Sequence, residues 1–414
     1  MTIYKIFAIT AVIALVITAI TAFVKRPAGI AGILASFIRY FLGSFFIFSG
    51  MVKAVDPLGT AFKMEEYFTV FGEYLPALSG FWDFWAHLAL PVSVFMIVLE
   101  IVLGISLILG AMPRLTLVLY AAIIAFFTFL TGFSAVTDKV TDCGCFGDFL
   151  KLKPITSFYK DLVLSGLVIA LIFLQKHIGL LINRRIALIS LAVLLFASLG
   201  FTMSNYYNLP VVNFRAYKVG TDLMKGKSTE GLDEGEIQTW YTMVNKATNE
   251  TKEMESKTYT SSGVWRDSTW TIDKSKTRQV IIREPEMPKI KDFIVNDRNE
   301  HDVADSLLSI QGYHFFVTTY NLDKANPDGF KKINELLRQA AKENITAAAI
   351  ISGNLDKTEQ LGEGLYKAYT LDATPIKTWM RSNPGLTLMQ GSTIRGLYHY
   401  NHLPTWEELK KEMK

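Results

Sequence analysis

The sequence predicts an α-helical integral membrane bundle of six spans, followed by a soluble α/β domain. Half of the 414 residues are hydrophobic, and the mean hydropathy is positive at +0.26. The apolar residues are concentrated in the first half, in stretches near the roughly 20 residues that cross the hydrocarbon core of a bilayer. After Tyr206 the composition becomes that of a globular domain. The formal net charge of +4 is too small for this mass to indicate nucleic-acid binding.

Each of the six apolar stretches is long enough for a membrane helix, although the fifth is short enough to be tilted or partly interfacial. They cover residues 3–24, 31–52, 86–110, 115–136, 160–176 and 186–204. The first stretch differs from a secretory signal peptide because its apolar run is too long. It is followed by Lys25, Arg26 and Pro27 rather than by small residues. We therefore expect it to remain as a span.

The charges of the short loops predict the orientation of the spans. The loops after the first, third and fifth spans carry basic residues, namely Lys25, Arg26, Arg114, Lys176, Arg184 and Arg185. The loops after the second and fourth spans mix both signs. Because positive loops stay in the cytoplasm, loop 137–154 and everything after residue 205 should face outward. In a bacterium with two membranes this side is the periplasm.

Two charged residues lie inside the predicted spans. At 1.5 Å per residue, Arg39 lies about 12 Å and Glu100 about 16 Å from the cytoplasmic ends of their helices. An unpaired charge at this depth is costly, so we predict that the two form an ion pair facing the bundle interior. The pair is either structural, or part of a proton path or a site for a quinone head group. Tyr40, Lys53 and Asp56 are further candidates to line such a cofactor site.

Both cysteines of the chain lie in one loop, TDKVTDCGCFGDFLKLKP, residues 137–154. With one glycine between them, Cys143 and Cys145 could form a small ring disulfide, which would add little stability because it closes almost no loop. Strained, exposed disulfides typically exchange, so we predict thiol–disulfide exchange at this pair. The flanking Asp142 and Asp148 should raise the pKa of the thiols. Inert thiols remain an alternative, as does a metal site, which would need more ligands than these two.

The soluble half divides near Pro285 and Pro288. Before them, the alternating runs EIQTWYTMV, GVWRDSTWTID and TRQVIIRE predict β-hairpins. After them, IKDFIVND, YHFFVTTY and ITAAAIIS are expected as strands, and GLTLMQGSTIRGLYHY as a hairpin. Helices are expected at EHDVADSLLSI, GFKKINELLRQAAKEN, TPIKTWMRS and TWEELKKEM.

This order of elements resembles that of membrane-tethered thioredoxin-like proteins, in both the opening segment and the closing segment SNPGLTLMQGSTIRGLYHYNHLPTWEELKK. The resemblance implies that Pro384 is the proline that is cis in that family. Thioredoxins carry Cys-x-x-Cys after the central strand, but here the chain reads TTYNLDKANPDGFKK, without cysteine. The domain therefore cannot exchange disulfides by itself, and we expect it to bind a peptide or protein client.

The segments RYFLGSFFIFSGMVKAVDP and LEIVLGISLILG resemble the DoxX and methylamine-utilisation MauE group of bacterial inner-membrane proteins. The matching residues are Arg39, Gly43, Gly50, Lys53, Asp56, Pro57, Glu100 and Gly104. The segment DCGCFGD is similar to the cysteine loop of MauE-like members. The resemblance covers roughly residues 31–176 and implies a four-helix core, to which the first and sixth spans are additions. It also implies a part in the maturation or redox handling of exported proteins.

Together these patterns predict a multi-pass inner-membrane protein that exchanges thiols and disulfides with exported proteins, with Cys143 and Cys145 as the reacting pair. The main alternative is a non-catalytic scaffold or assembly factor of a cell-envelope complex. A third is a proton or small-ion transporter centred on Glu100. The expected domains are 1–30 (first helix and linker), 31–180 (four-helix bundle), 181–210 (sixth span), 211–287 (β-rich) and 288–414 (thioredoxin-like).

Overall fold

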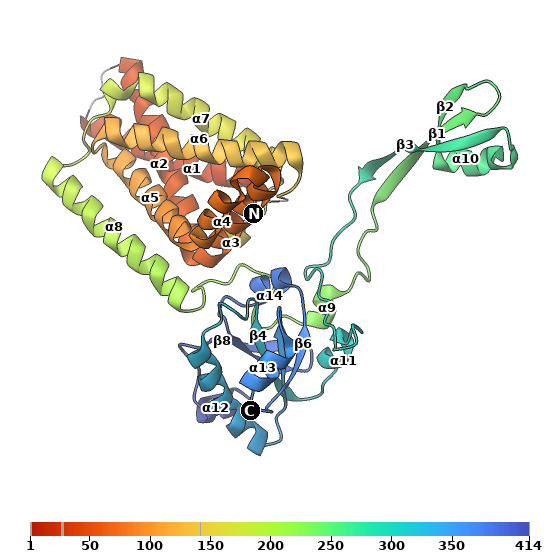
Figure 1. Ribbon diagram of the computed structural model, residues 1–414. Helices are drawn as coiled ribbons and strands as arrows, with labels where there is room; N and C mark the ends of the chain where they lie inside the picture. Colours follow the sequence, from red (N-terminus) through yellow and green to blue (C-terminus); the bar gives the residue numbers. More distant parts are fainter. Residues whose placement is uncertain (1, 26–28, 141, 414) are drawn as a thin grey trace.

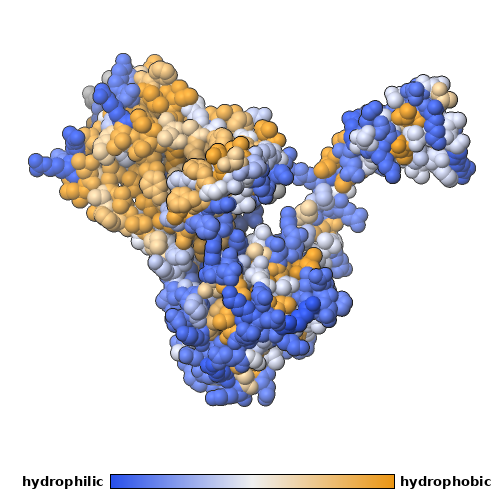
Figure 2. Space-filling model, in the orientation of Figure 1, coloured by the Kyte–Doolittle hydropathy of each residue, from blue (hydrophilic) through white to orange (hydrophobic). Residues whose placement is uncertain are grey.

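The computed structural model describes residues 2–25, 29–140 and 142–413, and Figure 1 shows its arrangement. Arg26 and Pro27, used above for the first span, lie outside these residues. Six helices of the described chain are long and apolar enough to cross a membrane, which confirms the predicted number of spans. They are α1 (Ile3–Lys25), α2 (Gly29–Val55), α5 (Ala89–Leu109), α6 (Pro113–Thr137), α7 (Pro154–Phe173) and α8 (Arg184–Tyr207). Figure 2 shows the apolar surface that these helices expose.

The centre of the bundle is the contact between α2 and α5, which small residues bring close together. A Cβ atom added at Gly104 would lie 2.7 Å from the backbone oxygen of Gly43. One added at Gly50 would lie 2.6 Å from Cγ1 of Ile101. Glycines in membrane helices permit such close backbone approach. These contacts determine the register in which the two helices pass each other.

The connection between α2 and α5 is helical, which the sequence analysis missed. It contains α3 (Pro57–Tyr74), η1 (Pro76–Leu78) and α4 (Ser79–His87). Asp56 caps α3 by accepting a hydrogen bond from the backbone N–H of Gly59 at 3.1 Å, and Pro57 occupies the first turn. The aromatic face of α3 packs against α6 and α4, with the ring centroid of Phe71 4.9 Å from that of Phe133 and 5.0 Å from that of Trp82. This position places α3 next to the cysteine loop.

The β-rich segment forms an antiparallel three-stranded sheet in the order β2-β1-β3, which confirms that it is rich in strands. The strands differ in part from the prediction: residues 251–255 form a strand that was not predicted, and the runs GVWRDSTWTID and TRQVIIRE contribute to one long strand instead of two. The strands are β1 (Glu236–Asn245), β2 (Thr251–Glu255) and β3 (Trp270–Arg283), with α10 (Ser256–Ser262) and η4 (Val264–Arg266) between the last two. A short helix, α9 (Leu223–Lys227), precedes them. In Figure 1 this sheet projects away from the rest of the molecule.

The last segment is a mixed five-stranded sheet in the order β6-β5-β4-β7-β8. Its strands β4 (Tyr313–Thr319), β5 (Ala347–Ile351) and β6 (Lys367–Thr370) are parallel, whereas β7 (Gly385–Gln390) and β8 (Thr393–His399) are antiparallel. The helices are α11 (Ala304–Leu308), α12 (Pro327–Lys342), α13 (Leu355–Leu361), α14 (Ala373–Trp379) and α15 (Trp406–Glu412). Helices α12 and α15 cover one face, and α11 and α14 cover the other. The apolar patterns of the sequence predict neither β6 nor α13.

One strand prediction in this segment is wrong. Residues 290–297 form no ladder, and only Asn296 makes isolated bridges, to Asp302 and Thr370. Asp292 has a φ of 54°, in the left-handed region, which interrupts an extended conformation. Ile290, Phe293 and Val295 are nevertheless buried, so their apolar pattern reflects core packing rather than strand pairing. The Asn383–Pro384 peptide bond is cis, as expected.

Candidate functional site

The cysteine loop is a compact turn anchored by one aromatic side chain. Gly144 and Gly147 have positive φ values of 62° and 50°, and the backbone N–H of Gly147 donates to the carbonyl of Gly144 at 3.0 Å. Phe146 is fully buried and packs edge-on against Phe45 of α2, with ring centroids 5.8 Å apart. Because Phe146 inserts into the bundle, the preceding Cys-Gly-Cys segment is held against the ends of α3 and α7.

The two thiols are free and differ in environment. Cys143 is half-buried, and its sulfur accepts hydrogen bonds from the Ser157 hydroxyl at 2.9 Å and from the Cys145 backbone N–H at 3.4 Å. A hydrogen bond from the Cys145 thiol lowers the pKa of Cys143 to about 7, against the effect of burial, with help from the charge of Lys160. The same hydrogen bond, together with burial, raises the pKa of Cys145.

The prediction that the flanking carboxylates raise the pKa of the thiols is therefore wrong for Cys143. Asp142 lies 3.2 Å from the ammonium of Lys63, and Asp148 lies 2.8 Å from the guanidinium of Arg381. Each carboxylate is compensated by its own cation. The charge that acts on Cys143 is instead the buried Lys160.

Lys160 is a functional candidate that the sequence analysis missed. It is buried in the first turns of α7, pairs with Asp161, and its ammonium lies 5.9 Å from the ring centroid of Phe146. Asp161 also accepts a hydrogen bond from Thr131 at 3.0 Å, so both of its carboxylate oxygens have a partner. The sequence carries a signal for this position, because Lys160 and Asp161 are two adjacent opposite charges at the start of an apolar span. Such charges in membrane segments usually face the protein interior.

Arg39 and Glu100 do not pair, although both are buried in the bundle as predicted. Glu100 pairs with Lys53, and Arg39 donates to the carbonyl of Gly179 at 2.7 Å and to the Tyr40 hydroxyl. The register of α2 and α5 explains the difference, because it places Glu100 beside Gly50. The 14 residues from Arg39 to Lys53 correspond to about 21 Å along the helix. The depths predicted for Arg39 and Glu100 from the ends of their spans do not include the register of α2 against α5.

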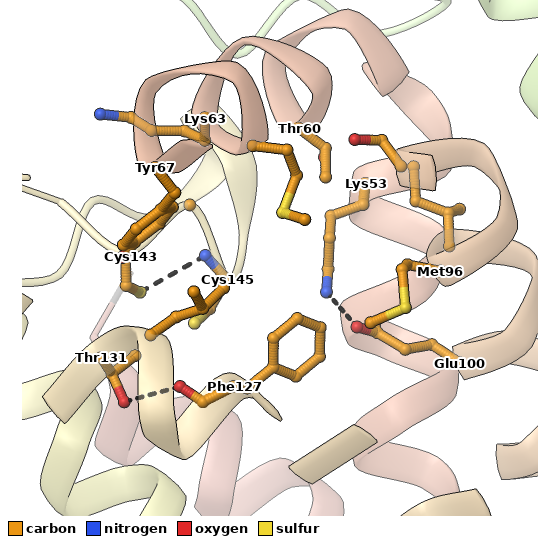
Figure 3. A pocket seen from close by; sticks show the side chains of 15 residues that line it. Lys53, Thr60, Lys63, Tyr67, Met96, Glu100, Phe127, Thr131, Cys143 and Cys145 are labelled. Atoms are coloured by element: carbon orange, nitrogen blue, oxygen red, sulfur yellow. Dashed lines mark hydrogen bonds and ion pairs between the residues drawn. The ribbon is translucent and has the colours of Figure 1, made fainter. Parts of the chain in front are cut away.

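The Lys53–Glu100 pair and the cysteines line the same cavity, of about 30 Å³. Figure 3 shows Lys53 and Glu100 pointing toward each other on one side, with the two cysteines on the other. Phe127 lies between them, with its ring centroid 4.8 Å from the Lys53 ammonium. Tyr67 of α3 lines the cavity too, and its hydroxyl is bonded to Ser134 at 2.8 Å.

The residues predicted to line a cofactor site, Arg39, Tyr40, Lys53, Asp56 and Glu100, are thus not brought together. Lys53 and Glu100 meet at the cavity, but Arg39 lies at the opposite end of α2. Asp56 faces the soluble region, where it accepts hydrogen bonds from Arg381 at 2.9 and 3.0 Å. Burial would raise the pKa of Asp56, but the Arg381 guanidinium holds it below its ordinary value.

Arg381 also joins the soluble region to the cysteine loop, because the same guanidinium contacts Asp148. Lys377, one turn earlier, lies 3.3 Å from Glu65 of α3. Figure 1 shows α14 on the side of the soluble region that faces the bundle. Between α14 and α3 is a polar cleft of about 410 Å³, and its wall includes Gly144, which lies between the two cysteines.

Fold and site together define an integral membrane protein in which a loop with two free thiols is packed on buried ion pairs and contacts an attached α/β region. Residues 31–174 match the family model of methylamine utilisation protein MauE, so this membrane region is of the MauE family. The matched range agrees with the range expected from the sequence motifs. Comparisons with curated proteins and with solved structures gave no match.

Proposed function

We propose that the protein exchanges thiols and disulfides with exported proteins at Cys143 and Cys145. The observation that carries this proposal is the setting of the half-buried Cys143 sulfur, which accepts hydrogen bonds from the Ser157 hydroxyl at 2.9 Å and from the Cys145 backbone N–H at 3.4 Å. A hydrogen bond from the Cys145 thiol, these contacts and the charge of Lys160 favour the thiolate and lower the pKa of Cys143 to about 7. At neutral pH this value leaves about half of the thiol as thiolate, whereas an ordinary free cysteine has only a few per cent. The thiolate is the nucleophile in disulfide exchange.

The reaction follows from the different environments of the two thiols. The Cys143 thiolate attacks a client disulfide, forms a mixed disulfide and releases one client sulfur as a thiolate. Cys145 then attacks the sulfur of Cys143, which breaks the mixed disulfide and releases the second client sulfur. Two electrons pass from the pair to the client, and the Cys143–Cys145 disulfide forms. The same steps in reverse oxidise a client dithiol.

The soluble region is proposed to be a thioredoxin-like client-binding module. The mixed sheet with three parallel and two antiparallel strands supports this assignment. Since neither cysteine lies in this region, it would bind the client and leave the chemistry to the membrane loop. The polar cleft between α3 and α14 is the proposed route by which an extended client segment reaches the thiols.

We further propose that this face of the membrane is the periplasmic one. Lys25 donates hydrogen bonds to the carbonyls of Leu180 and Leu181, so the basic loops that precede α2 and α8 lie together. The cysteine loop contacts the soluble region at the opposite end. The positive-inside rule supports a cytoplasmic position for the basic end.

The test is to trap the mixed disulfide in cells. With Cys145→Ser, an attacking Cys143 should accumulate as a covalent adduct, which mass spectrometry after acid quenching and alkylation would identify. Cys143→Ser is the matched control, and it should trap far less because Cys145 is buried and has a raised pKa. Permanently reduced thiols without any adduct would instead support the scaffold hypothesis, as would full function of the double Cys→Ser variant.

A further inference from the structure

We propose that Glu100 accepts the proton of the Cys145 thiol, through water held in the buried cavity between them. The inference rests on the proposed exchange reaction, and it assigns a proton acceptor to the resolving step. That step needs Cys145 as a thiolate, because the thiol itself is a poor nucleophile. Cys145 is only 8% exposed, so bulk water does not readily remove its proton.

The cavity has room for the water that this transfer requires. About 30 Å³ is enough for one or two water molecules, provided that polar atoms hold them. Three side-chain oxygens of its lining residues have no hydrogen-bond partner within the described part of the chain: Glu100 Oε2, Ser93 Oγ and Thr60 Oγ1. Glu100 is 1% exposed and Ser93 is 0% exposed. Buried polar atoms without a partner are costly, and water bridging them would remove this cost.

The hydrogen bonds and ion pairs that the neighbouring groups already make favour Glu100 as the proton acceptor. Lys53 pairs with Oε1 of Glu100, which holds the carboxylate in place, and no other residue that the structure describes bonds to Oε2. Asp161 is bonded through both oxygens, to Lys160 and Thr131, and does not line the cavity. Tyr67 is bonded to Ser134.

Charged and titratable groups surround Glu100 and the cavity from every packed element. They are Lys53 of α2, Lys63 and Tyr67 of α3, Tyr120 of α6, the two thiols of the loop, and Lys160 of α7. Within this set, Glu100 is the carboxylate that lines the cavity.

The step balances without any further reactant. The Cys145 proton passes through water to Oε2 of Glu100 while the Cys145 sulfur bonds to the sulfur of Cys143. The bond between Cys143 and the client sulfur breaks, and the client leaves as a thiolate. The proton then returns through the water to a departing thiolate or to solvent, which restores the Glu100 carboxylate.

Ellman's reagent separates the two steps in the purified full-length protein. The first coloured thiolate is released when Cys143 attacks, and the second is released when Cys145 resolves the adduct. In Glu100→Gln we expect an unchanged first phase and a second phase slower by about 10²-fold, since general base catalysis typically contributes 10²–10⁴-fold. The slow phase should accelerate tenfold per pH unit, because hydroxide must then remove the proton.

Four further variants make the result decisive. Glu100→Asp should restore much of the second phase, and Ser93→Ala should slow it less than Glu100→Gln does. Glu73→Gln is the matched control, because this exposed carboxylate of α3 lines neither the cavity nor the cleft and should leave both phases unchanged. If Glu100→Gln destabilises the protein by leaving Lys53 unpaired, Lys53→Met/Glu100→Gln removes both charges and should still lack the fast second phase.

A second phase with wild-type rate and pH dependence in Glu100→Gln, or in the double variant, would overturn this inference alone. A first phase that is slow in the wild-type protein would instead contradict the proposed exchange function.

Discussion

At the scale of single residues, the reactivity of the site depends on which charges are already compensated. Two carboxylates flank the cysteines in sequence, yet each has its own cation, Lys63 or Arg381. The cation that favours the Cys143 thiolate is Lys160, 17 residues away in the numbering. The residues next to Cys143 in the sequence therefore predict a raised pKa for this thiol, whereas its pKa is lowered.

Lys160→Met should raise the pKa of Cys143, because it removes a positive charge that stabilises the thiolate. Alkylation of Cys143 in wild-type protein should follow a titration with its midpoint near pH 7 and lose rate as the pH falls below it. In the variant the midpoint should move to higher pH, and the rate at pH 7 should fall severalfold. Peptide mass spectrometry after iodoacetamide pulses measures this rate.

The matched control for that experiment is Lys151→Met. Lys151 lies on the same loop but is 60% exposed and contacts Asp148 at 3.3 Å, so solvent screens its charge. Equal midpoints for Lys160→Met and the wild-type protein would show that the charge of Lys160 does not act on Cys143.

At the scale of elements, the glycine contacts of α2 and α5 determine which side chains meet inside the bundle. The register set at Gly43, Gly50 and Gly104 places Glu100 beside Lys53 and leaves Arg39 at the other end. A slip of one helical turn would move side chains by about 5.4 Å, enough to separate this pair. These glycines thus serve packing directly and, through the helix register, the site.

Gly104→Ala should destabilise the bundle, because the new methyl group would lie 2.7 Å from the Gly43 oxygen and 2.8 Å from Ile47. Overpacking of this kind typically costs about 1–3 kcal/mol. Gly166→Ala is the control, since nothing lies within 4 Å of its added Cβ. Thermal unfolding in detergent should show a lower midpoint for Gly104→Ala only, and equal midpoints would contradict the proposed role of this contact.

At the scale of the whole molecule, one buried arginine joins the soluble region to the membrane region. Arg381 is 4% exposed and contacts Asp56, which caps α3, and Asp148 of the cysteine loop. Removing one partner of a buried ion pair is costly, at about 3–5 kcal/mol, because the remaining charge stays buried. The position of the soluble region over the loop therefore depends on this residue.

Arg381→Ala should release the soluble region from α3. A carbodiimide cross-linker should join Glu65 to Lys377 or Lys324 in the wild-type protein, where the charged atoms lie 3.3 and 3.5 Å apart. The cross-linked peptides should largely disappear in the variant. Arg338→Ala removes an exposed pair with Glu363 within the soluble region and should leave the cross-link intact. An undiminished cross-link in Arg381→Ala would show that other contacts hold the two regions together.

Several parts of the fold could be predicted because they depend on local patterns. Apolar length predicted six spans, and strand-like patterns predicted β1, β3, β4, β5, β7 and β8 but neither β2 nor β6. The helix α3 was missed because its short stretch of mixed charge and aromatic residues resembles a loop. The apolar pattern of residues 290–297 predicts a strand, but burial without strand pairing produces the same pattern.

What the sequence by itself determined is therefore the set of parts: the spans, the two sheets, and a pair of thiols too close together to brace the fold. Only the tertiary structure decided which of the charges meet, such as Glu100 with Lys53, and Asp148 with Arg381, 233 positions away. The physical reason is that periodicity is a property of neighbouring residues, whereas ion pairing depends on helix register and domain contact. Those are set by packing between segments distant in sequence.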